Sequence, residues 1–110
     1  MVADDSWRTD DVLALFDTIL GLEDRSEAEK FFRDLLTLGE LRDLALRWSV
    51  ARLLDSGLHY ADISQRTGAS TATITRIASW LHHGEGGYRL LLDRARAAGT
   101  LPYPTGAAER

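Results

Sequence analysis

The sequence contains no cysteine, only two prolines and no long apolar run. The absence of cysteine excludes disulfides, thiolate metal sites and cysteine nucleophiles. No stretch approaches the roughly 18 consecutive apolar residues that a transmembrane helix needs. The acidic segment 1–11 also lacks the basic and then apolar pattern of a secretory signal peptide. We therefore expect a cytoplasmic protein without membrane partners, and its 110 residues fit one domain.

The acidic net charge of −4 is unevenly distributed along the chain. Residues 1–43 carry 12 acidic and 5 basic side chains, whereas residues 44–110 carry 5 acidic and 8 basic ones. Residues 64–83 contain no acidic residue, and they include the basic residues Arg66 and Arg76. Because phosphate binding depends on the local field of a surface, the acidic total does not exclude a nucleic-acid partner.

Apolar residues recur at helical spacing over most of the chain, and the alternation typical of strands is scarce. The pattern predicts six helices, over about residues 9–22, 26–36, 37–54, 60–67, 70–81 and 88–98. The predicted helix-start signals are Ser26 with Glu29, Thr37 with Glu40, and Ser70; the predicted helix-end glycines are Gly57 and Gly68. Residues 99–110 contain both prolines and no apolar stripe, so we expect a flexible tail there.

The second and third predicted helices are apolar around much of their circumference. Their apolar residues are Phe31, Phe32, Leu35, Leu36 and Leu38, followed by Leu44, Leu46, Trp48, Val50, Leu53 and Leu54. A helix that is apolar nearly all round is buried on more than one side. In a chain of this length a second copy is the simplest cover, and most homo-oligomers are two-fold dimers. We therefore expect a homodimer.

Residues 60–77 have the spacing of a helix-turn-helix. Ser64 is the small residue that lets the second helix approach the first, and Gly68 supplies a left-handed turn four residues later. The apolar contacts before and after the turn are Ile63, Ile74 and Ile77. The second helix carries short polar side chains on its outward face, which allows its backbone to enter the major groove. This coincidence favours DNA binding over a purely structural helical hairpin.

The segment 68–76, Gly-Ala-Ser-Thr-Ala-Thr-Ile-Thr-Arg, resembles the turn and recognition helix of the tryptophan repressor family. The chain is similar to the bacterial YerC/YecD group of Trp-repressor-related proteins as far as about Ala98, including Leu-Thr-Leu-Gly-Glu-Leu at 36–41. The resemblance implies an all-α fold of six helices and an intertwined homodimer in which the N-terminal helices of both chains share one core. It also implies one domain over residues 1–98, with dimerisation in its N-terminal helices and DNA binding over residues 58–83.

The resemblance also implies which residues face double-stranded DNA. The recognition-helix positions are Ser70, Thr71, Ala72, Thr73, Thr75 and Arg76. Hydroxyls there can bond base edges or phosphate oxygens, and Ala72 or a threonine methyl can pack on a thymine methyl. Arg66 ends the preceding helix and is either a phosphate contact or a solvated surface charge. The expected function is a transcription regulator, in the first instance a repressor, that reads a two-fold-related operator as a homodimer.

Arg47 and Arg76 match, by the same resemblance, two arginines that flank the amino-acid corepressor of the tryptophan repressor. This chain departs from the rest of that site, because Ile77 replaces a glycine and Trp80 replaces a serine. Bulky side chains there would fill the space that an indole needs, so we do not expect tryptophan as the effector. A self-filled pocket and another small ligand are the two alternatives.

The remaining polar residues suggest neither catalysis nor metal binding. Adjacent residues on a helix, such as His82 and His83, point about 100° apart and do not chelate one ion. No Ser/His/Asp arrangement has a supporting motif, so we expect no enzyme activity and no cofactor. For Arg47 a structural ion pair with Asp43 or Asp55 is the alternative to ligand binding. For the whole chain the alternatives are a helical module that binds a protein partner and an amino-acid-sensing regulator.

Overall fold

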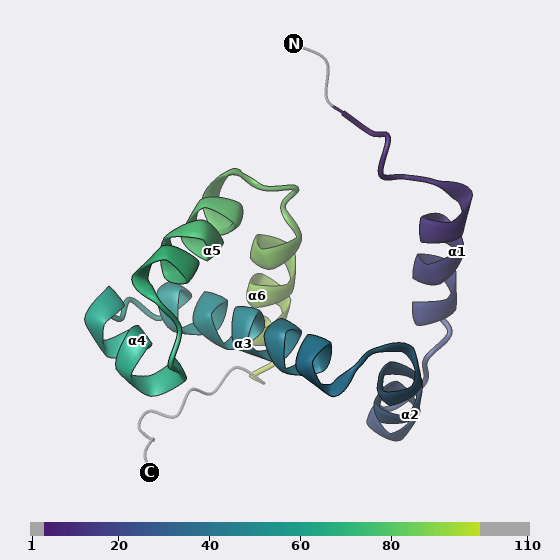
Figure 1. Cartoon of the computed structure of the whole chain (residues 1–110), viewed down its shortest axis with the longest axis horizontal. Coiled ribbons are helices and arrows are strands. Elements are labelled where there is room, and N and C mark those ends of the chain that lie inside the picture. Colours follow the sequence, from purple (N-terminus) through teal and green to yellow (C-terminus); the bar gives the residue numbers. More distant parts are fainter. Residues whose placement is uncertain (1–3, 100–110) are drawn as a thin grey trace. The chain divides into compact units, whose positions relative to one another are not determined.

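The computed structural model describes residues 4–99, and within that range it contains six α-helices and no strand (Figure 1). The helices are α1 (Asp10–Ile19), α2 (Arg25–Leu35), α3 (Leu38–Asp55), α4 (Tyr60–Thr67), α5 (Thr71–His83) and α6 (Gly87–Ala97). This confirms the predicted all-α class and the order of the six helices. Of the expected tail over residues 99–110, all but Gly99 lies outside the described residues. None of the helices in the described range is long and apolar enough to cross a membrane.

The chain divides into two compact units, residues 1–41 and residues 42–110. We call them the N-terminal unit and the C-terminal unit. The N-terminal unit contains α1, α2 and the first turn of α3, and the C-terminal unit contains the rest of α3 and the three following helices. The predicted helix-turn-helix therefore lies entirely within the C-terminal unit.

Both ends of α3 are fixed by the signals that its sequence predicts. At its start the Thr37 N–H donates to Glu40 Oε1 at 2.9 Å, and the Glu40 N–H donates to Thr37 Oγ1 at 3.1 Å. This reciprocal pair is a capping box. At its end Gly57 has φ of +91°, and the following N–H of Leu58 donates to the carbonyl of Leu53 at 3.2 Å. That bond closes the helix with a left-handed glycine, as predicted.

The start of α2 differs from the prediction. Asp24 caps this helix by accepting a hydrogen bond from the Glu27 N–H at 2.9 Å, so the predicted capping box of Ser26 with Glu29 is wrong. Asp24 and Glu27 have the same three-residue spacing, and Glu27 Oε1 accepts from the Glu23 N–H at 2.9 Å. An aspartate caps a helix as well as a serine does. The helix therefore begins directly after Asp24, which precedes Ser26 in the sequence.

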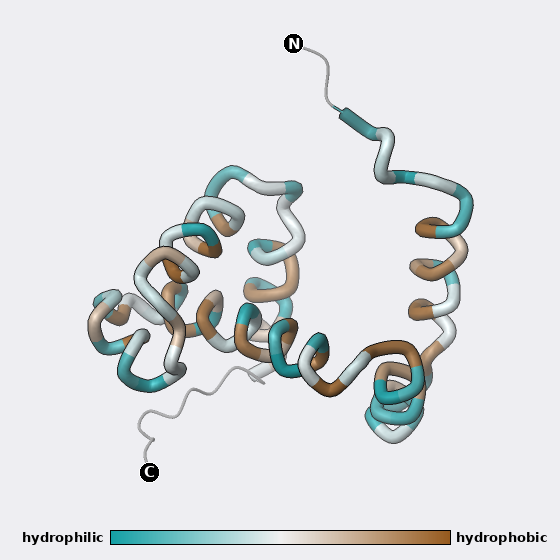
Figure 2. Tube along the Cα trace, in the orientation of Figure 1, coloured by the Kyte–Doolittle hydropathy of each residue, from teal (hydrophilic) through white to brown (hydrophobic). Residues whose placement is uncertain are grey.

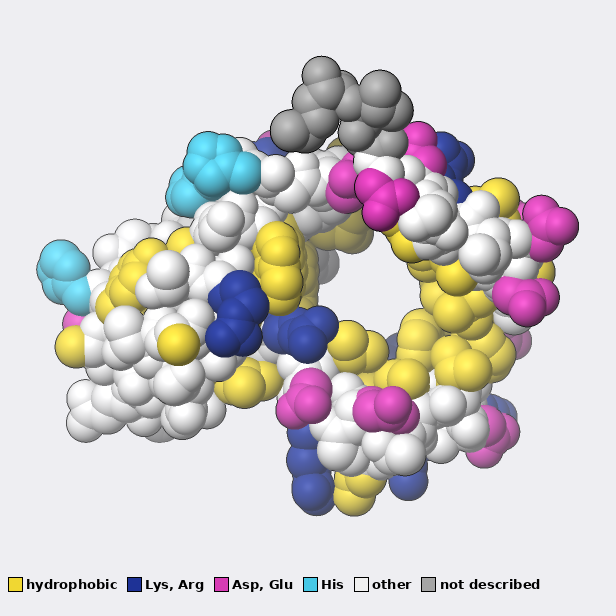
Figure 3. Space-filling model, turned by 45° about the horizontal axis from the view of Figure 1, so that its top comes forward, with side chains coloured by type: hydrophobic (Ala, Val, Ile, Leu, Met, Phe, Trp, Pro, Cys, Tyr) yellow, Lys and Arg dark blue, Asp and Glu magenta, His cyan; other side chains and the backbone are white. Residues whose placement is uncertain are grey.

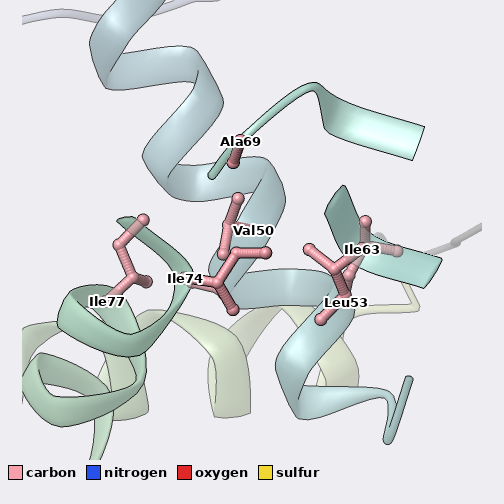
Figure 4. Close-up of a cluster of buried hydrophobic side chains, with 7 residues drawn as sticks. Val50, Leu53, Ile63, Ala69, Ile74 and Ile77 are labelled. Atoms are coloured by element: carbon pink, nitrogen blue, oxygen red, sulfur yellow. The ribbon is translucent and has the colours of Figure 1, made fainter. Parts of the chain in front are cut away.

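The core of the C-terminal unit is a cluster of buried apolar side chains from three helices and one turn (Figure 4). Its members are Val50, Ala51 and Leu53 of α3, Ile63 of α4, Ala69 of the turn, and Ile74 and Ile77 of α5. Full burial of one isoleucine contributes about 1.5–3 kcal/mol. The predicted inward positions of α4 and α5 are thus confirmed. In α6 the buried residue is Leu92, whereas Leu91, which shared the predicted apolar stripe, is 46% exposed.

A carboxylate joins the end of α3 to α6. Asp55, whose side chain is only 9% exposed, accepts a hydrogen bond from Arg89 at 2.8 Å and forms a second ion pair with Arg96. Arg89 also pairs with Asp93, four residues along α6, at 2.8 Å. Asp55 is thus bound by α6, and the alternative of an ion pair between Asp55 and Arg47 is wrong.

The N-terminal unit has helices but no core of its own. No described residue from 4 to 41 is buried. The large apolar side chains that it exposes are Trp7, Leu13, Phe16, Leu20, Leu35 and Leu38. Apolar and polar residues alternate along α1 (Figure 2), and hydrophobic side chains are visible beside acidic ones on the surface (Figure 3). The C-terminal unit also exposes large apolar side chains, but among the described residues it alone has a buried core.

The left-handed glycine of the helix-turn-helix gives the first testable prediction. Gly68 has φ of +78° with open space around the position of a Cβ atom, so Gly68→Ala meets no steric clash but adopts a strained backbone. We expect this substitution to lower the free energy of unfolding by about 1 kcal/mol. The matched control is Gly39→Ala, which also has open space but lies in α3, and which should be neutral or stabilising. Urea unfolding at one protein concentration measures both; equal effects would contradict the prediction.

Candidate nucleic-acid interface

The turn between α4 and α5 is held by local hydrogen bonds. The Gly68 N–H donates to the carbonyl of Ser64 at 2.8 Å, and this bond ends α4. Thr67 Oγ1 donates to the carbonyl of Ile63 at 2.7 Å and accepts from the Ala69 N–H at 3.1 Å. Ala69 is buried in the core, so the turn is fixed both by polar groups and by packing. The second helix therefore leaves the turn in one defined direction.

Ser70 is the N-cap of α5, as its sequence predicts. Its Oγ accepts from the Thr73 N–H at 3.1 Å and also bonds the Thr73 hydroxyl at 3.1 Å. The first turn of α5 contains no acidic residue. The free N–H groups and the dipole of a helix make its N-terminus favourable for anions. The start of α5 thus has a field suited to a phosphate group.

The structure places most of the predicted DNA-binding residues on the surface. Exposed side chains are Arg66 at the end of α4 and Ser70, Thr71, Ala72, Thr75 and Arg76 of α5. Helical geometry puts residues four apart on the same face, so Thr71 lies with Thr75 and Ala72 with Arg76. We call the exposed residues from the N-cap Ser70 to Arg76 of α5 the recognition face. It is made of short side chains, with one cation at its C-terminal end.

Thr73 differs from its predicted neighbours because it is half-buried. Its hydroxyl bonds Ser70, and its side chain lines a hollow between α3 and α5. Two sequence-predicted effector residues, Arg47 and Arg76, line the same hollow, which has a volume of about 200 Å³. The complete lining is Asp43, Leu46, Arg47, Thr73, Arg76, Ile77 and Trp80. We call it the polar hollow.

A second hollow lies beside α6 and was not anticipated from the sequence. It has a volume of about 610 Å³ and is lined by Trp48, Trp80, Gly84, Glu85, Gly87, Tyr88 and Leu91. The rings of Trp48 and Tyr88 are stacked, with centroids 6.3 Å apart and planes 6° from parallel. We call it the apolar hollow. Trp48 and Tyr88 are 40 positions apart in the sequence, so no local sequence pattern predicts their contact.

Partial burial of Tyr88 raises the pKa of its phenol above the ordinary value of 10.0, while the positive charge of Arg47 acts in the opposite direction. Arg47 is therefore close enough to influence both hollows. Its guanidinium carbon also lies 5.7 Å from the ring centroid of Trp80. The contact of Arg47 with Trp80 thus adds to the core packing between α3 and α5.

One family model and several known proteins match this chain over most of its length. Residues 10–96 match the family model described as Trp repressor protein. The chain is 43% identical to the uncharacterized protein YerC of Bacillus subtilis (strain 168) over 96 residues, 87% of this chain and 92% of that protein. Its structure is similar to a TrpR-like protein from Eubacterium eligens, with a TM-score of 0.82 at 39% identity, over 91% of this chain and 100% of that one. A Trp repressor candidate from Staphylococcus aureus gives a TM-score of 0.80 at 41% identity, over 87% and 96% of the two chains.

Tyr88 gives a prediction about pH. A phenol whose pKa is raised by folding stabilises the folded state below the unfolded pKa, and this stabilisation is lost as pH rises from about 10 through the folded value. The free energy of unfolding should therefore fall with pH in that range, and Tyr88→Phe should remove this part of the fall while keeping the ring. Arg47→Gln should raise the pKa of Tyr88 further. Tyrosine absorbance titration of the three proteins measures the shifts; a Tyr88 titration unmoved by Arg47→Gln would contradict the assigned contact.

Proposed function

Because the chain belongs to the Trp repressor protein family, we propose that it is a sequence-specific DNA-binding transcription regulator that acts as a homodimer. The observation that carries the proposal is the recognition face: it is exposed, free of acidic residues and directed outward by a helix-turn-helix with a buried core. Short hydroxyl side chains allow the backbone of α5 to approach base edges closely. The proposed direction of regulation is repression.

We assign two kinds of DNA contact to these residues, one to base edges and one to phosphate oxygens. Thr71, Ala72 and Thr75 lie on the exposed side of α5, where hydroxyls and methyl groups can read base edges in the major groove. Arg66 and Ser70 flank the turn and are placed to bond phosphate oxygens, which fixes the register of the helix without reading sequence. Half-buried Thr73 serves mainly to hold the start of α5, through its bonds to Ser70.

The exposed apolar surface of the N-terminal unit supports the proposed homodimer. Leu13, Phe16 and Leu20 recur on α1 at the spacing of one helical face, and each is at least 37% exposed. The edge of Trp7 meets Phe16, with centroids 6.4 Å apart, and extends this apolar face. A second copy of the chain supplies the same face, so two N-terminal units can form one shared core. Two recognition helices then read a two-fold-related site, with half-sites about one helical turn apart.

Tryptophan is not the effector that we propose. Ile77 is buried and Trp80 occupies the wall of the polar hollow, where the resemblance would need open space. Asp43 also lines this hollow, and its carboxylate repels the carboxylate of an amino acid beside the two arginines.

The DNA-binding proposal predicts different results for the two kinds of contact. Selection from a random duplex pool should yield a two-fold symmetric site. On that site Arg66→Ala should weaken binding to all sequences alike and reduce the slope of log affinity against log salt by about 1. Thr75→Ala should instead relax the preference at one base pair per half-site.

The matched control is Arg94→Ala, which removes the same charge from an exposed position on α6, away from the recognition face. Its salt slope should remain close to that of the unchanged protein. If the three variants bind alike, the docking face is wrong. If no sequence is enriched and a protein partner is bound without salt dependence, the chain is a protein-interaction module.

The homodimer predicts a mass of two chains in sedimentation equilibrium. Phe16→Asp should shift the protein towards one chain at micromolar concentration, because it places a carboxylate in the shared apolar core. Thr18→Asp adds the same charge to the exposed polar side of α1 and is the control, expected to stay dimeric. A Phe16→Asp protein that dimerises like the control would place the interface elsewhere.

A further inference from the structure

Trp80 stands between the polar hollow and the apolar hollow and lines both. It lies on α5, four residues after Arg76 and three after the buried Ile77. Its side chain is 42% exposed. The indole therefore forms a wall that the two hollows share.

Arg47 contacts this indole through its guanidinium group. The guanidinium comes from α3 and lies 5.7 Å from the ring centroid, within the range of a cation–π interaction. The contact connects α3 to the C-terminal half of α5, beyond the core residues Ile74 and Ile77. The core fixes how closely α5 packs, and the Arg47–Trp80 contact adds a lateral restraint near the recognition face.

The remaining space of the polar hollow is small for a ligand. Its volume of about 200 Å³ lies below the roughly 300–1,000 Å³ of typical small-molecule sites. It also brings Asp43 together with two arginines, so its charged groups can partly balance each other without a bound ion. The side chain of Trp80 forms part of the wall of this hollow.

We propose that Trp80 and Arg47 are positioning residues for the recognition face: the indole lies at the boundary of the two hollows and, together with the core contacts of Ile74 and Ile77, holds α5 in its orientation. This inference rests on the proposed DNA-binding function and deepens it. Its consequence is that the protein binds its operator at full affinity without a ligand in the polar hollow.

The test is removal of the indole and its return as a free molecule. Trp80→Ala joins the two hollows and leaves space for indole, since cavities made by deleting large apolar groups bind small aromatic molecules. Operator affinity should fall about tenfold in this variant, in line with the loss of a positioned aromatic contact. Millimolar free indole should restore much of that affinity, and Trp80→Phe should retain most of it. The unchanged protein should not respond to indole.

A readout without DNA separates this inference from the proposed function. Backbone amide signals of Thr71, Ala72 and Thr75 in NMR spectra should shift in Trp80→Ala and return towards their original positions with indole. Arg47→Met should shift them in the same direction, and it serves if Trp80→Ala does not fold. Leu91→Ala is the control, because Leu91 lines only the apolar hollow, and indole should not change its operator affinity.

The outcomes are distinct. If the unchanged protein binds no selected DNA but the amide signals respond as described, the proposed function fails while Trp80 still positions α5. If neither the amides nor operator affinity change in Trp80→Ala and Arg47→Met, the positioning role is wrong. If indole or another small ligand strengthens operator binding of the unchanged protein, the region is an effector site and the inference is overturned.

Discussion

Val50 and Leu53 of α3 form the apolar surface against which α4 and α5 pack, and the direction of the recognition face depends on this contact. Burial of Ile74 and Ile77 leaves one rotational position for α5, because side chains on a helix keep fixed angles to each other. Thr75 follows a buried residue and therefore points outward. The polar surface that we assign to DNA is thus oriented by hydrophobic burial on the opposite side of the same helix, and not by any contact of its own.

Ion pairing explains how an acidic protein can present a surface suited to phosphate. In the C-terminal unit the carboxylate of Asp55 is bound between Arg89 and Arg96, and Asp93 pairs with Arg89. These acids are compensated on α6 and add little to the field at α5. The acidic excess of the chain lies in residues 1–43, whereas the first turn of α5 has no acid. Local arrangement, and not net charge, decides which partner a surface can attract.

The sequence predicts features that depend on near neighbours better than those that depend on distant ones. Thr37 with Glu40, Gly68 and Ser70 act within four residues, so their roles as caps could be read directly. The start of α2 was misplaced because two overlapping pairs have the same capping spacing, and periodicity alone does not choose between Asp24 and Ser26. The stack of Trp48 on Tyr88 and the Asp55 ion pairs could not be predicted, since they join positions that only the tertiary fold brings together. In the candidate site the exposed residues were anticipated from the helix-turn-helix spacing, whereas the half-buried position of Thr73 depends on the packing of α5 on α3.

Unlike the C-terminal unit, the N-terminal unit needs an apolar partner surface to be stable. Ordering a chain costs conformational entropy, and burial of apolar side chains is the main compensation. The described residues 4–41 bury no side chain, although α1 and α2 are both well-formed helices with good caps. Capping contributes only about 1 kcal/mol per helix, so the helices of this unit require an apolar partner surface to be stable. If that surface is the same unit of a second chain, as we propose, then folding of the N-terminal unit and pairing of the recognition helices are one equilibrium. Affinity for a two-fold operator then depends on protein concentration through the same contacts that stabilise the fold.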